Sequence, residues 1–171
     1  GNVYLLYQDD DPIQLRREIR LTRYTDFDAT WPASDTLVGY GAASLKPALM
    51  NNVLEYENVQ LALGAVGEVW VTWSAEDRVS VAHSIDHGAT FTVADVAAQP
   101  NWYYYGPGLC VRGGRVLVSY AADNPVSGLT EIWAVTSPDA GGTWSSPQSL
   151  QTSAPSSGVG SLTFCAQGPG P

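Results

Sequence analysis

The chain of 171 residues is acidic and rich in the residue types of short strands and tight turns. Its formal net charge is −9, its hydrophobic content is 44%, and it contains 17 glycines, 11 prolines, 6 tryptophans and 9 tyrosines. This composition indicates a globular protein rather than a disordered one. Phosphate backbones and anionic membranes attract basic surfaces, and the chain has no block of Lys or Arg, so we expect no nucleic acid and no membrane as partners. No apolar run approaches the roughly 20 residues of a membrane span.

Strand-like segments recur along the chain in a constant order. Each is rich in β-branched and aromatic residues, with apolar residues at every other position, as is typical of half-buried strands. The first group covers 2–8, 18–24 and about 34–38; the second covers 59–64, 68–74, 78–84 and 92–97; the third covers 108–113, 115–121, 131–137 and 147–152. A last segment, 161–168, resembles the opening strand of a further group.

This repetition predicts an all-β fold, a β-propeller of four-stranded antiparallel blades with about three blades in this chain. The aspartates of a recurring turn, Asp26, Asp86 and Asp139, are 60 and 53 residues apart, close to the roughly 40–50 residues of a blade with its loops. We expect one domain over 1–171. Its parts are three strands of a first blade (1–40), a connecting loop (41–57), a second blade (58–98), a third blade (107–152) and a lone opening strand (161–168).

The recurring turn joins the third and fourth strands of each predicted blade. It reads SIDHGATF at 84–91 and SPDAGGTW at 137–144, with a degenerate copy, YTDFDATW, at 24–31. An Asp carboxylate can accept backbone N–H bonds within such a turn, a Gly adopts positive φ at little cost, and a Thr hydroxyl can bond back to the loop. The closing aromatic ring is expected to pack on the blade. A structural role is therefore predicted for Asp26, Asp86, Gly88, Thr90, Phe91, Asp139, Gly141, Thr143 and Trp144.

The repeated Ser-x-Asp-x-Gly-x-Thr-Trp/Phe pattern, at this spacing and between these strands, resembles the Asp-box or bacterial neuraminidase repeat. Sialidases carry this repeat, and so do other β-propellers such as sortilin-type receptors and photosystem assembly factors. With the aligned strands, the resemblance covers nearly the whole chain and implies a sialidase-like propeller fold. It is specific for fold and poor for function, because the Asp-box lies away from the active face in that family.

The catalytic residues that the resemblance would imply are not found. Sialidases hold the substrate carboxylate with three arginines, one of them in a Phe/Tyr-Arg-Ile-Pro motif, and they use a Tyr–Glu pair and an Asp acid. No such motif occurs here, and Arg112 and Arg115 flank a turn that is expected on the Asp-box face. We therefore assign no catalytic residue and favour a non-catalytic binding or assembly module. The alternative is a fragment or half of a sialidase-like glycoside hydrolase.

A ligand would be expected at the face opposite the Asp-boxes. The loops between the second and third strands of the blades, 8–14, 74–78 and 121–128, are all acidic, and the loop 99–108 adds four aromatic residues. Carboxylates beside aromatic rings suit neutral sugars or a hard cation such as Ca²⁺, although acidic turns also serve to keep sheet edges soluble. The candidate ligand-binding residues, here called the acidic rim, are Asp9, Asp10, Asp11, Glu76, Asp77, Trp102, Tyr103, Tyr104, Tyr105 and Asp123.

The remaining expectations concern partners, cofactors and compartment. Beyond Ca²⁺ no cofactor is indicated, and Cys110 and Cys165 are expected to be small core residues with free thiols. Three blades do not close a ring, since propellers use four to eight. We therefore expect a homodimer in which the 161–168 strands are exchanged to complete a six-bladed ring, or further blades on another chain. The family resemblance suggests an extracellular or cell-surface protein; no signal peptide is visible in the sequence, which begins at Gly1.

Overall fold

The computed structural model describes residues 1–11, 16–25, 35–41, 59–75 and 77–152, and these residues form three antiparallel sheets. Sheet 1 has the order β1-β2-β3 and sheet 2 the order β4-β5-β6-β7, while sheet 3 runs β8-β9-β10-β11 across its width. The strands are β1 (Asn2–Asp11), β2 (Arg16–Thr25), β3 (Thr36–Tyr40), β4 (Gln60–Leu63), β5 (Val69–Ala75), β6 (Arg78–Ser84), β7 (Thr92–Ala98), β8 (Tyr103–Arg112), β9 (Arg115–Asn124), β10 (Leu129–Ser137) and β11 (Gln148–Thr152). The all-β prediction is confirmed.

Within each sheet, strands that follow one another in the sequence are paired antiparallel. In sheet 2, for example, Val71 pairs with Ala82 and Leu61 pairs with Val71. Residues directly opposite each other share one face of the sheet, so this register decides which side chains of neighbouring strands face the same core.

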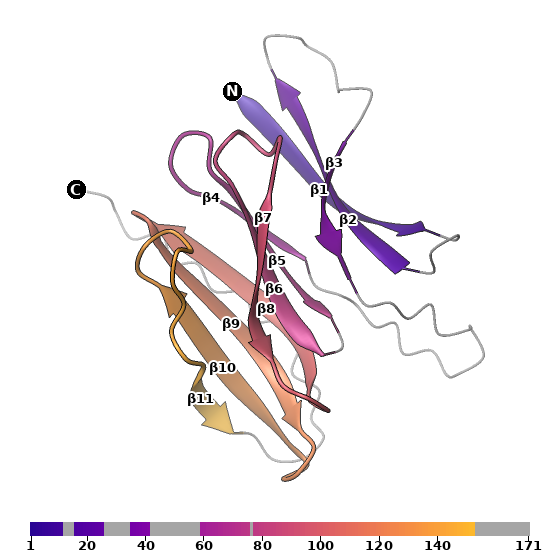
Figure 1. Cartoon of the computed structure of the whole chain (residues 1–171), viewed down its shortest axis with the longest axis vertical. Coiled ribbons are helices and arrows are strands. Elements are labelled where there is room, and N and C mark those ends of the chain that lie inside the picture. Colours follow the sequence, from indigo (N-terminus) through magenta and orange to yellow (C-terminus); the bar gives the residue numbers. More distant parts are fainter. Residues whose placement is uncertain (12–15, 26–34, 42–58, 76, 153–171) are drawn as a thin grey trace.

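Sheet 2 lies between the other two sheets and packs against both (Figure 1). All seven residues of β5 are buried, since neighbouring sheets cover both faces of this strand. Alternate side chains of a strand point to opposite faces, so Val69, Val71 and Trp73 face sheet 1 whereas Trp70 faces sheet 3.

The core therefore has two layers. The layer between sheets 1 and 2 is formed by Ile19, Leu21, Val38, Val69, Val71, Trp73 and Ala82. The layer between sheets 2 and 3 is larger and contains Trp70, Val79, Val81, Val96, Ala97, Tyr104, Leu109, Val116, Val118, Tyr120, Ala122 and Val135. Face-to-face packing of successive small antiparallel sheets is the arrangement of blades in a propeller.

The sheets are aligned so that equivalent ends lie together. One end, here called the loop end, is where β5 is followed by β6 and β9 by β10; the opposite end, the turn end, carries the turns 84–91 and 137–144 (Figure 1). At the loop end, Trp73 Nε1 of sheet 2 donates to the Tyr40 carbonyl of sheet 1 at 3.0 Å. At the turn end, Asn2 Nδ2 lies 3.3 Å from His87 Nδ1. These contacts hold sheets 1 and 2 in the same orientation.

Several strands extend further than the sequence pattern predicts. Asp9, Asp10 and Asp11 lie in β1 rather than in a loop, because the ladder with β2 continues as far as the pair Asp11–Arg16. Similarly, β9 continues to Asn124, which leaves only residues 125–128 between β9 and β10. The ladder hydrogen bonds use the backbone alone, so acidic side chains at the end of a hairpin do not stop them.

The opening strand of sheet 3 also begins earlier than predicted. Residues 103–105, predicted to lie in a loop, belong to β8, and the register with β9 shifts between Tyr105 and Gly108. A β-bulge absorbs the Gly106–Pro107 step, where Gly106 has φ 59°, so the strand continues through two residues that usually end one. Cys110 is half-buried in β8, whereas Cys165, the predicted loop 41–57 apart from Gly41, and the predicted strand 161–168 lie outside the described residues.

Candidate functional site

The two turns at the turn end have the same hydrogen bonds. Asp86 Oδ1 accepts from the Thr90 backbone at 2.9 Å and Asp86 Oδ2 accepts from the Thr90 hydroxyl at 2.6 Å. The equivalent distances from Asp139 to Thr143 are both 2.8 Å. The preceding serines donate to the Asp and accept from the glycine backbone, since Ser84 Oγ and Ser137 Oγ each lie 2.8 Å from the glycine nitrogen two positions after the Asp.

These bonds end on groups of the same turn, and they favour the charged form of each carboxylate. The Thr90 hydroxyl, then the Thr90 backbone and the Ser84 hydroxyl, hold the pKa of Asp86 well below its usual range. For Asp139 the Thr143 backbone is the leading cause of a lowered pKa, followed by the Thr143 hydroxyl. A carboxylate that is held ionised by its own turn is suited to bracing the backbone rather than to accepting a proton in catalysis.

The backbone of both turns is left-handed at two successive residues. His87 and Gly88 have φ values of 60° and 83°, and Ala140 and Gly141 have 53° and 86°. The first of each pair donates its N–H to the preceding hairpin: His87 to the Gly67 carbonyl at 2.9 Å, and Ala140 to the Gly114 carbonyl at 2.7 Å. Each turn is thereby attached to the first two strands of its own sheet.

Each turn also packs against the preceding sheet. A Cβ added at Gly88 would lie 2.5 Å from Leu21 Cδ2 of β2, and one at Gly141 would lie 3.0 Å from Trp70 Cη2 of β5. Phe91 packs on the core layer between sheets 1 and 2, and Trp144 packs on the layer between sheets 2 and 3. The degenerate turn with Asp26 lies outside the described residues.

The structure describes part of the acidic rim, and its described aspartates lie at the loop end, opposite the Asp turns. Asp9 is exposed in β1 and pairs with Glu18; Asp77 precedes β6 with its side chain 67% exposed; Asp123 is exposed near the end of β9. These three aspartates lie at the same end of their sheets. Only the backbone of Asp10 and Asp11 is described, and Glu76 lies outside the described residues.

The aromatic residues of the predicted rim do not form one exposed surface. Tyr104 belongs to the core, where its ring contacts Tyr120 edge to face at 5.6 Å, so its expected place in an exposed loop is wrong. It is buried because β8 begins at Tyr103 and alternate side chains point inward. Trp102 packs edge to face against Trp133 at 6.1 Å, whereas Tyr103 is half-exposed.

Tyr105 is the aromatic residue that contacts a predicted carboxylate. Its hydroxyl donates to Asp123 Oδ1 at 2.5 Å, and Thr130 Oγ1 donates to the same oxygen at 2.7 Å. Burial, together with the Asp123 carboxylate, raises the pKa of Tyr105 to about 12. Tyr105 therefore stays protonated at neutral pH and orients the Asp123 side chain.

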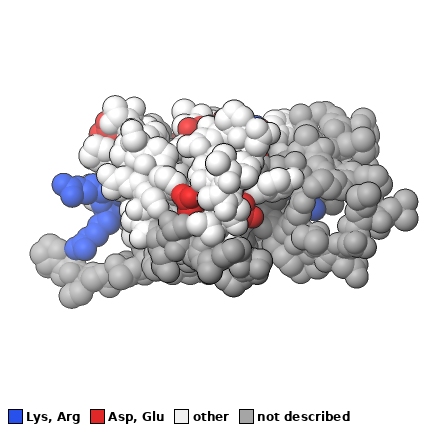
Figure 2. Space-filling view, turned by 90° about the horizontal axis from the view of Figure 1, so that it is seen from below, with Lys and Arg blue, Asp and Glu red and all other residues white. Residues whose placement is uncertain are grey.

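The charged groups on this side of the molecule are dispersed. Figure 2 views the molecule from below the orientation of Figure 1, and it shows acidic side chains as separate spots among uncharged residues, with basic side chains at one edge and also elsewhere in the view. No group of three or more His, Cys, Asp or Glu residues that could hold a metal ion occurs among the described residues. Nor does the described part of the chain have a helix long and apolar enough to cross a membrane.

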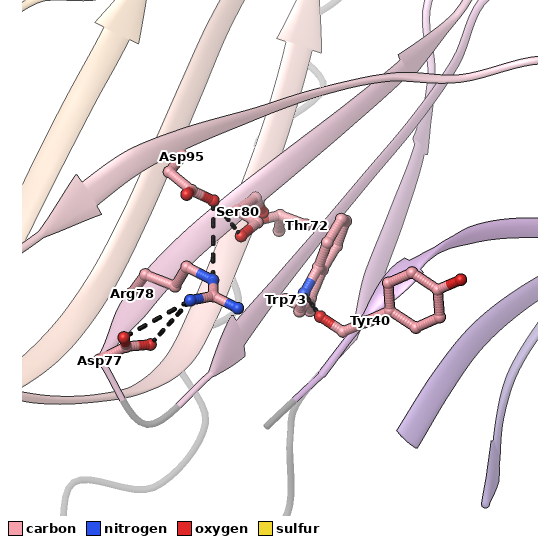
Figure 3. Close-up of polar contacts among 7 residues, drawn as sticks. All are labelled: Tyr40, Thr72, Trp73, Asp77, Arg78, Ser80 and Asp95. Atoms are coloured by element: carbon pink, nitrogen blue, oxygen red, sulfur yellow. Dashed lines mark hydrogen bonds and ion pairs between the residues drawn. The ribbon is translucent and has the colours of Figure 1, made fainter. Parts of the chain in front are cut away.

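A pocket of about 350 Å³ lies between the edge strand of sheet 1 and the face of sheet 2. Residues of β3 line it from sheet 1, and residues of β5, β6 and β7 line it from sheet 2; Figure 3 draws Tyr40, Trp73, Arg78, Ser80 and Asp95 of this lining. The lining residues, here called the intersheet pocket, are Leu37, Val38, Gly39, Tyr40, Trp73, Arg78, Ser80, Val93 and Asp95.

The polar side of the pocket is an ordered chain of contacts. Ser80 Oγ donates to Asp95 Oδ1 at 2.6 Å, and Arg78 Nε lies 3.9 Å from the same oxygen. Arg78 Nη1 also lies 3.2 Å from Asp77 Oδ1, so the pocket adjoins the acidic rim. Figure 3 shows Arg78, Ser80 and Asp95 together on one side of Trp73, whereas the Tyr40 ring points away from them.

Sequence reasoning did not identify this pocket. In the sequence, Arg78 ends the acidic loop 74–78 and begins the predicted strand 78–84, and Asp95 lies in a predicted fourth strand, so neither was a candidate ligand-binding residue. Cross-strand pairing brings Ser80 opposite Asp95, and this pairing passes through a register shift between Val79 and Ser80. An Asp on an otherwise apolar strand was the one signal that could have indicated it.

Comparisons with known proteins give a structural likeness only. A scan against protein-family models finds no match, and no curated protein matches the sequence. Among solved structures, the chain resembles an alpha-L-arabinanase from Penicillium chrysogenum complexed with arabinobiose, with a TM-score of 0.57 and 15% sequence identity. The match covers 88% of this chain and 45% of the arabinanase, so the chain spans less than half of that protein's length. The arabinanase is a β-propeller, and the predicted fold class is confirmed.

Proposed function

We propose that the chain is a segment of an Asp-box propeller that serves as a non-catalytic binding or assembly module, with carbohydrate as its ligand. The observation that carries the Asp-box assignment is the matching network of the two turns, in which Ser, Asp, Gly and Thr at the same spacing make the same bonds, with lengths that agree within 0.2 Å. The turns occupy one end of the sheets, which leaves the loop end for a ligand.

The positions of the described arginines support a non-catalytic role. Arg20 is held by Glu18 and by Asp35, 2.6 Å away, and Arg78 is held by Asp77 and Asp95. The arginines of the β8–β9 turn, Arg112 and Arg115, lie at the turn end with the Asp turns, away from the rim. An arginine cluster of the kind that binds a substrate carboxylate needs several guanidinium groups directed at one point.

A second candidate is a fragment or half of a sialidase-like glycoside hydrolase. The likeness to an arabinanase favours it, since that protein was solved with a sugar, arabinobiose. The part of such an enzyme that is not present in this chain would then supply the missing catalytic groups.

One paired experiment separates the two candidates. The purified chain is tested for binding on a glycan array and for turnover of a panel of fluorogenic glycosides. Binding without turnover supports the module, and turnover supports the hydrolase. If the chain shows no binding and no turnover, both candidates are overturned. The variant Asp123→Asn should weaken binding if the acidic rim takes part.

The partners and the compartment are part of the same proposal. We propose that the ring is completed by a second copy of this chain or by blades on another chain. In support, no described strand pairs with the outer edge of β1, and Val3 and Leu5 on that strand are 53% and 51% exposed. Glycan binding would suit an extracellular or cell-surface protein, and Ca²⁺ remains a candidate ligand of the rim carboxylates.

A further inference from the structure

We propose that the intersheet pocket is a subsite for one residue of a neutral oligosaccharide. This proposal rests on the carbohydrate-binding function proposed above, and it names a site and a sugar class that the acidic rim does not. The pocket lies between β3 of sheet 1 and β5, β6 and β7 of sheet 2. Its volume of about 350 Å³ is within the range of small-molecule sites.

The pocket offers one acceptor and one donor that have no partner in the described part of the chain. Among the described residues, no group donates to Asp95 Oδ2 and none accepts from Arg78 Nη2, although the other ends of both side chains are held. A sugar carries adjacent hydroxyls, each of which can donate and accept. Two neighbouring hydroxyls can therefore satisfy the carboxylate and the guanidinium together.

The polar groups are held in place before a ligand arrives. Ser80 is buried and directs its hydroxyl to Asp95, and the Ser80 carbonyl accepts from Thr72 Oγ1 at 2.9 Å. A binding group whose own partners fix its position loses little freedom when the ligand binds. Asp95 is thus a preorganised acceptor.

Accessible apolar side chains also line the pocket, one from each sheet. Leu37 is 38% exposed and Val93 is 47% exposed, and both line the pocket. Such walls suit the C–H face of a sugar ring, which gains by leaving water while the ring hydroxyls keep polar partners. Trp73 forms the floor of the pocket. Its ring is buried, and a Cβ added at Gly39 would lie 2.6 Å from Trp73 Cζ2.

The charge of the pocket decides which sugars fit. One guanidinium, Arg78, is placed between two carboxylates, those of Asp77 and Asp95. The local charge is therefore negative, and the whole chain carries −9. An acidic sugar would therefore be repelled, whereas a neutral sugar would not.

The test uses calorimetric titration of the full chain with neutral disaccharides (arabinobiose, xylobiose, cellobiose and lactose), with 3′-sialyllactose and with trilysine. We expect binding of at least one neutral disaccharide. Asp95→Asn, which keeps the shape of the side chain, and Val93→Trp, which fills the pocket, should each weaken that binding about tenfold or more. Leu150→Trp is the matched control, because it places a new Trp on the exposed strand β11 of sheet 3 and should leave affinity unchanged.

Each other outcome has a distinct meaning. If a neutral disaccharide binds and Asp123→Asn weakens it, but both pocket variants bind like the wild type, the pocket proposal is wrong and the proposed function stands. If no sugar binds, the proposed function fails and the pocket proposal fails with it. Tighter binding of 3′-sialyllactose or trilysine than of every neutral sugar overturns the assignment to neutral sugars. Should Val93→Trp not fold, Asp95→Asn decides the matter alone.

Discussion

At the scale of single residues, the two Asp turns show how a carboxylate can serve the fold rather than chemistry. Asp86 and Asp139 each use both oxygens on a Thr four positions later, and a Ser two positions earlier donates to the same carboxylate. All the partners come from one short turn. The arrangement therefore depends little on the remainder of the molecule, and it can be repeated wherever the motif occurs.

The lowered pKa values of these aspartates predict a pH dependence of stability. In the folded chain, donors from Thr90 and Thr143 depress the pKa of Asp86 and Asp139, whereas in the unfolded chain both return to the ordinary value. Their contribution is therefore complete above the unfolded pKa and is lost as the pH falls toward the folded pKa. We expect Asp86→Asn combined with Asp139→Asn to lower the melting temperature by about 2–10 °C at neutral pH.

Melting curves recorded by circular dichroism between pH 7 and pH 3 check this expectation. The difference in melting temperature between wild type and double variant should shrink below about pH 4, because the unfolded wild-type chain then binds protons at these aspartates whereas the folded chain keeps them ionised. A difference that stays constant down to pH 3 would show that the negative charge is not what the turns require.

At the scale of elements, each Asp turn joins its own sheet to the preceding one. Gly88 contacts Leu21 of sheet 1, and Gly141 contacts Trp70 of sheet 2, so the glycine is needed for two reasons. Its φ is positive, and a side chain there would meet the neighbouring sheet. The turn is thus both a hairpin connection and an intersheet contact.

Two glycine substitutions should separate these reasons. Gly113→Ala places a Cβ in open space at φ 56°, so it should cost only about 1 kcal/mol for the left-handed backbone. Gly88→Ala combines φ 83° with a Cβ 2.5 Å from Leu21 Cδ2, and we expect a further loss of about 1–3 kcal/mol. Urea unfolding measures both. Equal losses would mean that Leu21 moves aside freely and that the turn contact contributes little.

At the scale of the whole molecule, sheet 1 differs from the other two. Sheets 2 and 3 have four strands each, whereas three strands are described for sheet 1, and β1 has a described partner on one edge only. Proteins ordinarily cover such an edge, because its backbone groups would otherwise pair with another chain. A strand from a second copy is one way to cover it.

This proposal makes a prediction about mass in solution. If residues 161–168 of each copy complete the first blade of the other, static light scattering should give a mass about twice the 18.2 kDa of one chain, since a reciprocal exchange has two-fold symmetry. Deleting 161–171 should return the mass to that of a monomer. A wild-type chain that is monodisperse at 18.2 kDa would contradict the exchange.

The sequence alone determined the fold class and the place of the hairpins. Alternating apolar residues and turn residues act over a few positions, so the strands of sheets 2 and 3 could be predicted within a few residues and the turns 84–91 and 137–144 could be located. Where the prediction of strand ends was wrong, as at Asp9 to Asp11 and at Tyr103 to Tyr105, the cause was backbone pairing, which continues regardless of side-chain polarity.

Only the tertiary structure decided which candidate residues are exposed and which of them lie together. Tyr104 is buried because sheet 3 packs on sheet 2, and the intersheet pocket exists because β3 of sheet 1 meets β5, β6 and β7 of sheet 2. Leu37 and Asp95 are 58 positions apart and share no local pattern. Their proximity results from packing one sheet on another, and packing depends on the shapes of two whole sheets rather than on the periodicity of either strand.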